Sequence, residues 1–531
     1  MWSSRLRSPS TPKAQLVKDE ERIVSNALVT YAAKLITGSI GFLMVPFLIR
    51  SLGEETYGVM GVCWSILGFM LLVELGIRPA VMRQFTSALF KDEVDRSNEV
   101  ASTAFAFYLL ISSVIVGVLV ITGDRFLDSM NVPAELAGDA YYTLVLVGAS
   151  ASFGLLGVPF TSAIFSQLRH DIEHYVLVAK SMTTAILIVA LFTLRDPRLL
   201  AWALVDSFAT VSVFLAFVWQ AKRLCPSLEV APRHVTRRGF ADVAGFGTYT
   251  TLIGAAAWIN MQSGPVVISY FLGTAAVAHF TPILGVMGTL TPIQTAFLAP
   301  LRTFITKAHA TDDWGVIGRV LIRSTRYSLL STGAIVTLLA SVAGPFVGVW
   351  LGANFEDTAQ VLLIWCVGWL FQASTGASYG IYVGTARLRV LTLVNTIIAI
   401  VSISIGVFLV ARSDWGVVGI AWGMLAAQVV RSTTFFFYSS SICQVDKLEY
   451  LKQGFFGPGV ALLALGASSL GIQHALTLHP FAELVAAATG GGAVFALLAW
   501  RVGLPADDHR RVQSYIDKIR TRISKGRGAA G

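Results

Sequence analysis

The stretch "VSNALVTYAAKLITGSIGFLMVPFLI", residues 24–49, decides the fold, because it is an apolar run long enough to cross a bilayer. A hydrocarbon core of ~30 Å takes about 20 apolar residues as a helix. The run is too long for the core of a cleaved signal peptide, so we expect it to stay as a helix. A second apolar run, "YGVMGVCWSILGFMLLVELGI" at 57–77, follows after a short loop.

The composition extends this interpretation to the whole chain. Of its 531 residues, 55% are hydrophobic and only 13% are charged, and the mean hydropathy is +0.68. A soluble domain carries roughly twice that charged fraction, so lipid must be the solvent for much of the surface. Fourteen spans are expected: 24–49, 57–77, 100–122, 137–160, 175–194, 199–220, 240–272, 276–298, 320–350, 359–383, 390–410, 416–437, 455–472 and 480–500.

The distribution of basic residues gives the orientation. With fourteen spans, 32 of the 40 lysines and arginines fall on the side of the two termini, five fall on the opposite side, and three lie inside spans. Lysine and arginine collect on the cytoplasmic side of membrane proteins. We therefore expect a bacterial plasma (inner) membrane protein with both ends in the cytoplasm.

An internal repeat divides the chain. Leu52-Gly53 and Leu272-Gly273 lie 220 residues apart, and Ala201-Trp202 and Ala421-Trp422 show the same offset. Because each repeat would hold six spans, the two lobes share one orientation and are related by a pseudo-two-fold axis along the membrane normal. The expected fold is all-α, and its parts are an N-terminal tail (1–22), an N-lobe (23–220), a basic linker (221–239), a C-lobe (240–443), two further spans (444–501) and a basic C-terminal tail (502–531).

Several chemical classes lack support in the sequence. The four cysteines are scattered and suggest neither disulfides nor a metal site. The phosphate-binding motif GxxxxGK[ST] is absent, and no nucleic acid is expected as a partner. His170 and His174 form one i, i+4 pair, which we interpret as part of a solvated turn rather than a metal site.

Charged residues within spans are the candidate functional residues, since a charge at the bilayer centre costs at least ~2.5 kcal/mol unless it meets a partner or a wet cavity. Lys34 and Arg431 lie deepest, and we expect them to line a cavity. The other cations can either join that cavity or extend to the cytoplasmic headgroups. The predicted cationic site comprises Lys34, Arg78, Arg83, Lys180, Arg302 and Arg431.

Acidic and neutral polar residues in the spans complete the prediction. Glu74 lies one turn before Arg78 and can pair with it. Asp206 either titrates during ion coupling or forms a structural pair with a neighbouring helix. Asn26 lies on the polar face of the first span, whereas Asn260 and Gln262 either line the cavity or hydrogen-bond between helices.

Three segments carry a family resemblance: "VPFLIRSLGEETYGVMGVCWSILGFMLLVELGIRPAVMRQ" (45–84), "GVWLGANFEDTAQVLLIW" (348–365) and "YGIYVGTARLRVLTLVNTIIAIVSISIGVFLVARSDWGVVGIAWG" (379–423). Together they resemble the polysaccharide transporter branch of the multidrug/oligosaccharidyl-lipid/polysaccharide exporter superfamily, the O-antigen and oligosaccharide flippases. The resemblance implies a non-enzymatic flippase that moves undecaprenyl-diphosphate-linked oligosaccharide to the periplasmic leaflet by alternating access.

The resemblance also implies partners, which are the lipid-linked glycan, membrane lipids and proteins of glycan polymerisation or assembly. No cofactor is implied, and coupling to H⁺ or Na⁺ stays open. Two alternatives are weighed: a cation-coupled drug exporter, which should show excess carboxylate in its cavity, and a membrane enzyme of glycan assembly, which should show a large external loop with clustered acidic residues or histidines.

Overall fold

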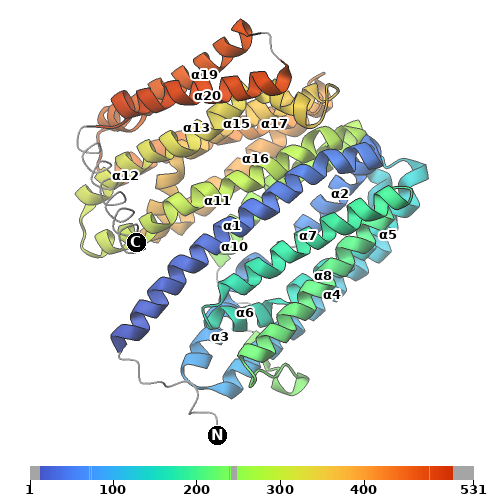
Figure 1. Cartoon of the computed structure of the whole chain (residues 1–531). Coiled ribbons are helices and arrows are strands. Elements are labelled where there is room, and N and C mark those ends of the chain that lie inside the picture. The colour runs from blue at the N-terminus through green and yellow to red at the C-terminus, as the bar shows by residue number, and fades with distance from the viewer. Residues whose placement is uncertain are drawn as a thin grey trace, which may run out of the picture. The chain divides into compact units, whose positions relative to one another are not determined.

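A computed structural model describes residues 12–70, 72, 74–237, 239–240, 248–476 and 479–505, and the regular elements in these ranges are helices. The chain forms two compact units, Met1–Thr289 and Leu290–Gly531 (Figure 1). The first unit holds α1 (Pro12–Leu52), α2 (Glu54–Met70), α3 (Glu74–Phe90), α4 (Val94–Ser129), α5 (Ala134–Leu156), α6 (Val158–Ser166), α7 (His170–Leu194), α8 (Leu199–Leu224), η2 (Pro232–His234), α10 (Thr248–Leu272) and the start of α11 (Thr274–Ala310).

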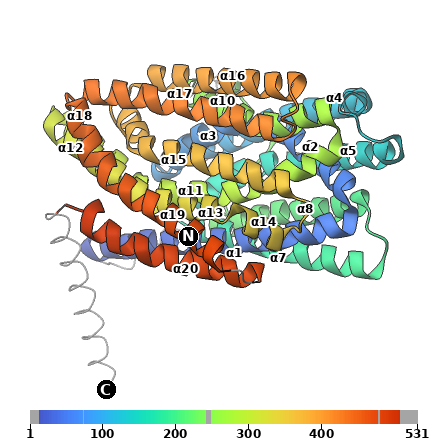
Figure 2. The same cartoon turned by 90° about the horizontal axis from the view of Figure 1, so that it is seen from above.

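The second unit takes the end of α11 and the remaining helices. Within it, α16 lies beside α17 and α19 lies beside α20 (Figure 2). Its elements are α12 (Trp314–Ser328), η3 (Leu329–Gly333), α13 (Ala334–Ser341), α14 (Ala343–Trp350), α15 (Glu356–Gly384), α16 (Leu388–Arg412), α17 (Val418–Ile442), α18 (Lys447–Tyr450), η4 (Leu451–Phe456), α19 (Gly457–Ala475), α20 (Pro480–Leu498) and η5 (Ala499–Gly503).

The expected all-α membrane architecture is confirmed, but the count of fourteen spans is not. Ten described helices are long and apolar enough to cross a membrane, or eleven if the bent pair α12–α14 counts as one span. Three predicted spans fall outside this set. Helix α2 has only 17 residues, whereas α10 and α17 are less apolar because they carry polar residues in mid-helix, Asn260 and Gln262 in the first and Gln428 and Arg431 in the second.

Two predicted spans are broken. The span expected at 320–350 bends by 71° between Trp314–Ser341 and Ala343–Trp350. The helix in the span expected at 137–160 is interrupted at Gly157, between α5 and α6, although Ala134–Ser166 together counts as one candidate span. Pro159 has no backbone N–H and cannot continue the hydrogen bonding of α5. The sequence after Ile77, expected to be loop, instead forms most of α3.

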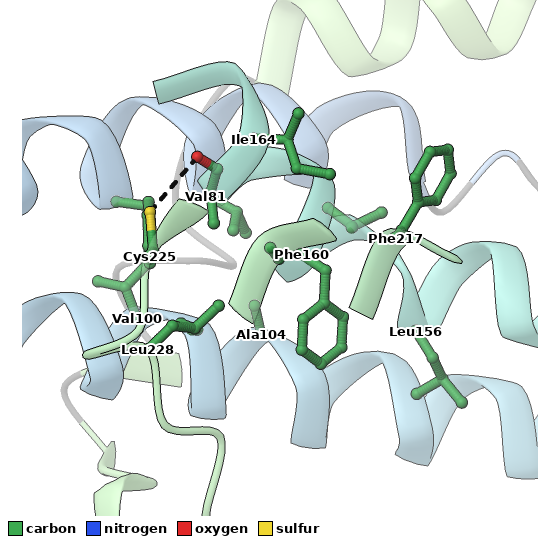
Figure 3. Packing of buried hydrophobic residues seen from close by; sticks show 14 of the residues in the cluster. Val81, Val100, Ala104, Leu156, Phe160, Ile164, Phe217, Cys225 and Leu228 are labelled. Carbon is green, nitrogen blue, oxygen red and sulfur yellow. Dashed lines mark hydrogen bonds between the residues drawn. The ribbon is translucent and has the colours of Figure 1, made fainter. Parts of the chain in front are cut away.

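The core of the first unit gathers α3, α4, α6 and α8 around apolar side chains (Figure 3). Phe160, Ile164 and Phe217 are buried there, and the thiol of Cys225 donates to the carbonyl of Ala163 at 3.8 Å. Leu228, from the predicted basic linker, is buried in the same cluster. The start of the linker is therefore part of this core.

Side chains of α4 hold the backbone of that linker in place. Asn98 donates to the carbonyl of Ser227 at 3.1 Å and accepts from the N–H of Glu229 at 2.9 Å. One turn further along α4, Ser102 accepts from the N–H of Ala231 at 3.1 Å. Asn98 and Ser102 are buried, and these bonds provide partners for polar groups that would otherwise be costly to bury.

Positive φ angles support the predicted internal repeat. Gly53 and Gly273, 220 residues apart, have φ of +83° and +86°. Both follow a helix end, and each N–H bonds to the carbonyl four residues earlier, a helix-ending geometry that favours glycine. Asp92 and Asp312, also 220 apart, have φ of 57° and 55°. Turns at equivalent positions thus share one backbone conformation.

Candidate functional site

Helix α17 presents one charged and one amide side chain on a single face. Gln428 and Arg431 are three residues apart, so they lie on the same side of the helix. Both side chains point at Gln372 of α15, whose Oε1 accepts from Gln428 Nε2 at 3.2 Å and from Arg431 Nη1 at 3.4 Å. Gln372 therefore joins the two residues through one oxygen atom.

A third amide, Gln294 of α11, completes what we call the Arg431 cluster: Gln294, Gln372, Gln428 and Arg431. Gln372 Nε2 donates to Gln294 Oε1 at 3.3 Å, and Gln294 Nε2 donates to the backbone carbonyl of Gln372 at 3.4 Å. Gln294 is only 7% exposed. The cluster thus links three helices of the second unit inside a largely apolar environment.

The charge of Arg431 is not balanced within the described part of the chain. No carboxylate there forms an ion pair with its guanidinium, and its Nε atom is buried without a hydrogen-bond partner. The guanidinium carbon lies 5.6 Å from the ring centroid of Phe435, a cation–π contact. A guanidinium has five N–H donors, and a single bond at 3.4 Å leaves most of that capacity for an anionic ligand.

The first unit contains a second cluster of charges, at the start of α7. Arg78 of α3 donates to Glu173 at 2.8 Å, and its guanidinium carbon lies 5.9 Å from the centroid of Phe165. The ring of His170 lies 4.3 Å from Phe165 on centroids. Charge and aromatic contacts therefore connect α3, α6 and α7.

The histidine pair lies in a partly exposed turn, and one of the two residues also contacts a neighbouring helix. His174 Nε2 and the hydroxyl of Thr30 are 2.8 Å apart, so this pair links α7 to α1. Just before α7, Arg169 donates to Asp171 at 2.9 Å, and this hydrogen bond raises the pKa of Arg169. The turn therefore contains one local ion pair, and His174 connects the start of α7 to α1.

The predicted site residues differ in their burial. Lys180 of α7 and Asp206 of α8 form an ion pair at 3.2 Å, the structural arrangement that the sequence left open for Asp206. Lys34, one turn after Thr30 on α1, and Arg83, near the middle of α3, are exposed.

Three predicted residues cannot be placed. The side chains of Asn26, Glu74 and Arg302 lie outside the described residues. The expected pair of Glu74 with Arg78 therefore stays a prediction, although Arg78 does bond Glu173. Lys34 and Arg431 belong to different units, and a cavity that they share stays a prediction.

The two polar residues of α10 differ in their surroundings. Gln262 is 9% exposed, and its Nε2 donates to the carbonyl of Trp64 on α2 at 3.4 Å. Of the two roles left open for Gln262, hydrogen bonding between helices is the one observed. Asn260 Oδ1 is buried and has no partner among the described residues.

Sequence reasoning missed the three glutamines of the Arg431 cluster. Uncharged amides in a span give no charge signal. Gln372 lies far away in sequence and meets Arg431 only through helix packing, and Gln294 joins the cluster through its bonds to Gln372. A search for glutamines inside predicted spans would have found them, since such residues need partners in lipid.

Comparison with known proteins gives the family. The family described as "Polysaccharide biosynthesis protein" matches residues 23–300, which is more than half of the chain. The chain belongs to this polysaccharide biosynthesis protein family. This result agrees with the resemblance carried by the sequence segments above.

The relatives that match most of this chain are distant from it in sequence. "Uncharacterized membrane protein EpsK" of Bacillus subtilis is 19% identical over 502 residues, which cover 94% of this chain and 99% of that protein. A protein of Shigella flexneri with the name "Putative O-antigen transporter" is 19% identical over 407 residues, covering 76% of this chain and 94% of the relative. The similarity thus spans most of the chain.

Solved structures show the fold. The lipid II flippase MurJ in an inward closed conformation gives a TM-score of 0.67 at 13% identity, covering 90% of this chain and 98% of MurJ. An inward-facing multidrug resistance transporter of the MATE family gives 0.66 at 13% identity, covering 78% and 98%. The family member described here therefore has the fold of the MOP superfamily and is a multi-pass membrane protein.

Proposed function

We propose that this protein moves a glycan linked to a lipid diphosphate, an O-antigen, capsule or exopolysaccharide repeat unit, from the cytoplasmic to the periplasmic leaflet of the bacterial plasma membrane. The observation that carries the proposal is the unbalanced charge of Arg431 among three neutral amides. An arginine within a span, with part of its guanidinium buried, is costly unless an anion compensates it, and guanidinium geometry fits phosphate oxygens. The family, the named O-antigen transporters and the MurJ fold support the same substrate class.

In this proposal the protein works by alternating access of its two repeats, with both termini in the cytoplasm. Movement of the cargo needs no covalent chemistry, so the protein acts as a transporter and not as an enzyme. Proteins that polymerise or assemble the glycan are proposed partners, because they would receive the product on the far side. Coupling to H⁺ or Na⁺ stays an open part of the proposal, with Glu74 and Asp206 as the acidic candidates.

The alternative of a cation-coupled drug exporter has less support. Such a protein should offer a cationic drug an unpaired carboxylate within its spans. The three carboxylates described above each bond a cation: Asp171 at 2.9 Å, Glu173 at 2.8 Å and Asp206 at 3.2 Å. The Arg431 cluster has the opposite sign, and it favours an anionic cargo.

A deletion strain tests the proposed function. Loss of the gene should cause lipid-linked glycan to accumulate on the cytoplasmic side, and the wild-type gene should reverse this. The accumulated glycan is measured by extraction of the lipid carrier, with and without an impermeant enzyme that labels the outer leaflet. If the glycan reaches the outer leaflet at the normal rate in the deletion strain, the proposed function is wrong.

A further inference from the structure

Two atoms of the Arg431 cluster lack hydrogen-bond partners, and they have opposite hydrogen-bonding character. Arg431 Nε is a donor and Gln428 Oε1 is an acceptor, and both are buried without a partner among the described residues. They belong to residues three apart on α17, so they lie on one face. A buried polar atom without a partner costs free energy, and a ligand that supplies both partners removes that cost.

The chemistry of such a ligand is constrained on both sides. The guanidinium needs an acceptor, and anionic oxygen is the strongest one. The amide oxygen of Gln428 needs a donor, which a phosphate diester cannot supply. A sugar joined to phosphate at its anomeric carbon supplies both, since the phosphate oxygens lie next to a hydroxyl or amide N–H on the neighbouring ring carbon.

We infer that Gln428 and Arg431 together bind the junction between the phosphate and the first sugar of the cargo. This inference rests on the proposed function and assigns one contact to each partner: Arg431 to the phosphate and Gln428 to the sugar. As whole side chains, both residues are only half-buried. A ligand can therefore approach the two residues from their exposed side.

Gln372 is the positioning residue of this junction site. Its Oε1 accepts from both Gln428 and Arg431, at 3.2 and 3.4 Å, and its Nε2 is held by Gln294 at 3.3 Å. These bonds fix the Gln428 amide with its nitrogen toward Gln372 and its oxygen away from it. Because Gln372 is neutral, it orients the guanidinium without cancelling the charge that attracts phosphate.

The test uses two soluble probes of equal charge on the purified full-length protein. Glucose 1-phosphate carries the phosphate and the neighbouring hydroxyl, whereas methyl phosphate carries the phosphate alone, and both are dianions at pH 8. Kd values are taken from the rise in unfolding temperature with probe concentration. The wild type should bind glucose 1-phosphate about tenfold more tightly, as one additional hydrogen bond allows.

The variants separate the two contacts. Gln428→Leu should bind both probes equally, at the affinity that the wild type shows for methyl phosphate. Arg431→Gln should bind neither probe measurably. Gln360→Leu is the matched control, because Gln360 is an exposed glutamine of α15 and should leave both Kd values unchanged.

Equal Kd values of the wild type for the two probes would overturn the inference, and so would a preference that survives in Gln428→Leu. If Gln428→Leu does not fold, the two Kd values of the wild type, for glucose 1-phosphate and for methyl phosphate, are sufficient to test the inference. Failure of the proposed function is a separate result: the deletion strain would then export its glycan normally, whatever the probes do.

Discussion

Arg431 shows how a single residue can be informative in a membrane protein. Its depth in a span was evident from the sequence, because a charge in an apolar run stands out and must have a partner or a function. Its surroundings were not evident, since Gln372 of α15, which accepts from Arg431, and Gln294 of α11, which bonds Gln372, are brought together by helix packing. The structure thus turns a predicted cation into a site with defined neighbours.

Replacement of Gln372 by glutamate tests whether the absence of charge on this side chain matters for transport. The new carboxylate would lie about 3.4 Å from the Arg431 guanidinium and would form an ion pair with it, which removes the charge available to the cargo. Transport should fall at least ~10-fold, as expected when about 1.4 kcal/mol or more of binding is lost, while thermal stability stays equal or rises. The measurement is glycan export in the deletion strain at matched protein amount, with Gln360→Glu as control. Normal export by Gln372→Glu would contradict this role.

The Lys180–Asp206 ion pair supports a structural prediction at the same scale. Both side chains are about a quarter exposed or less, so Asp206→Asn should leave an unpaired lysine within the membrane and destabilise the protein by about 1–3 kcal/mol. The double variant Lys180→Met/Asp206→Leu should recover that stability, because neither charge remains. Denaturation of the purified protein in detergent measures this effect, and unchanged stability of Asp206→Asn would show that the pair is not structural.

At the scale of elements, helix α2 is defined by close contacts through glycine. A Cβ atom at Gly58 would lie 1.8 Å from the carbonyl oxygen of Thr274, and one at Gly68 would lie 2.0 Å from Gln262 Nε2. Trp258 of α10 donates from its indole nitrogen to the carbonyl of Gly68 at 2.5 Å. These glycines let α2 pack directly against α10 and the start of α11 within the first unit.

Gly58→Ala should therefore disturb this packing. The added methyl overlaps backbone and not a flexible side chain, so we expect a loss of about 1–3 kcal/mol in stability. Gly41→Ala on α1 is the matched control, because a Cβ there meets nothing within 4 Å, and it should be neutral or stabilising by up to about 1 kcal/mol. Thermal unfolding of the two variants and the wild type measures the change in stability. Equal stability of the two would mean that the contact at Gly58 is looser than described.

Helices were predicted from sequence more reliably than their breaks. Apolar runs located the helical segments because lipid allows no other structure for them. The bend at Val342, between α13 and α14, is followed by Gly344 and Pro345, and Pro345 has no N–H to bond the carbonyl of Ser341 at the end of α13. Helix α3 was missed because its charged residues made it resemble a loop, although its buried face packs into the core of the first unit.

At the scale of the whole molecule, the internal repeat was the most successful inference. An offset of 220 residues in short motifs predicted a duplication, and the same offset recurs in the φ angles of Gly53 and Gly273. The compact units divide the chain elsewhere, at Thr289, because α10 packs on α2 of the first repeat. The repeat is thus defined by similarity along the sequence, whereas the two units are defined by contacts between helices.

One measurement tests the central claim directly: transfer of a fluorescent diphosphate-linked oligosaccharide lipid between the leaflets of vesicles that contain the purified protein. An impermeant quencher added outside reports the fraction of label in the outer leaflet over time. The account predicts protein-dependent transfer by the wild type and a rate at least ~10-fold lower for Arg431→Gln, since the loss of a charged hydrogen bond is about 1.5–3 kcal/mol. Equal rates for Arg431→Gln and the wild type, at matched protein content and orientation, would contradict it.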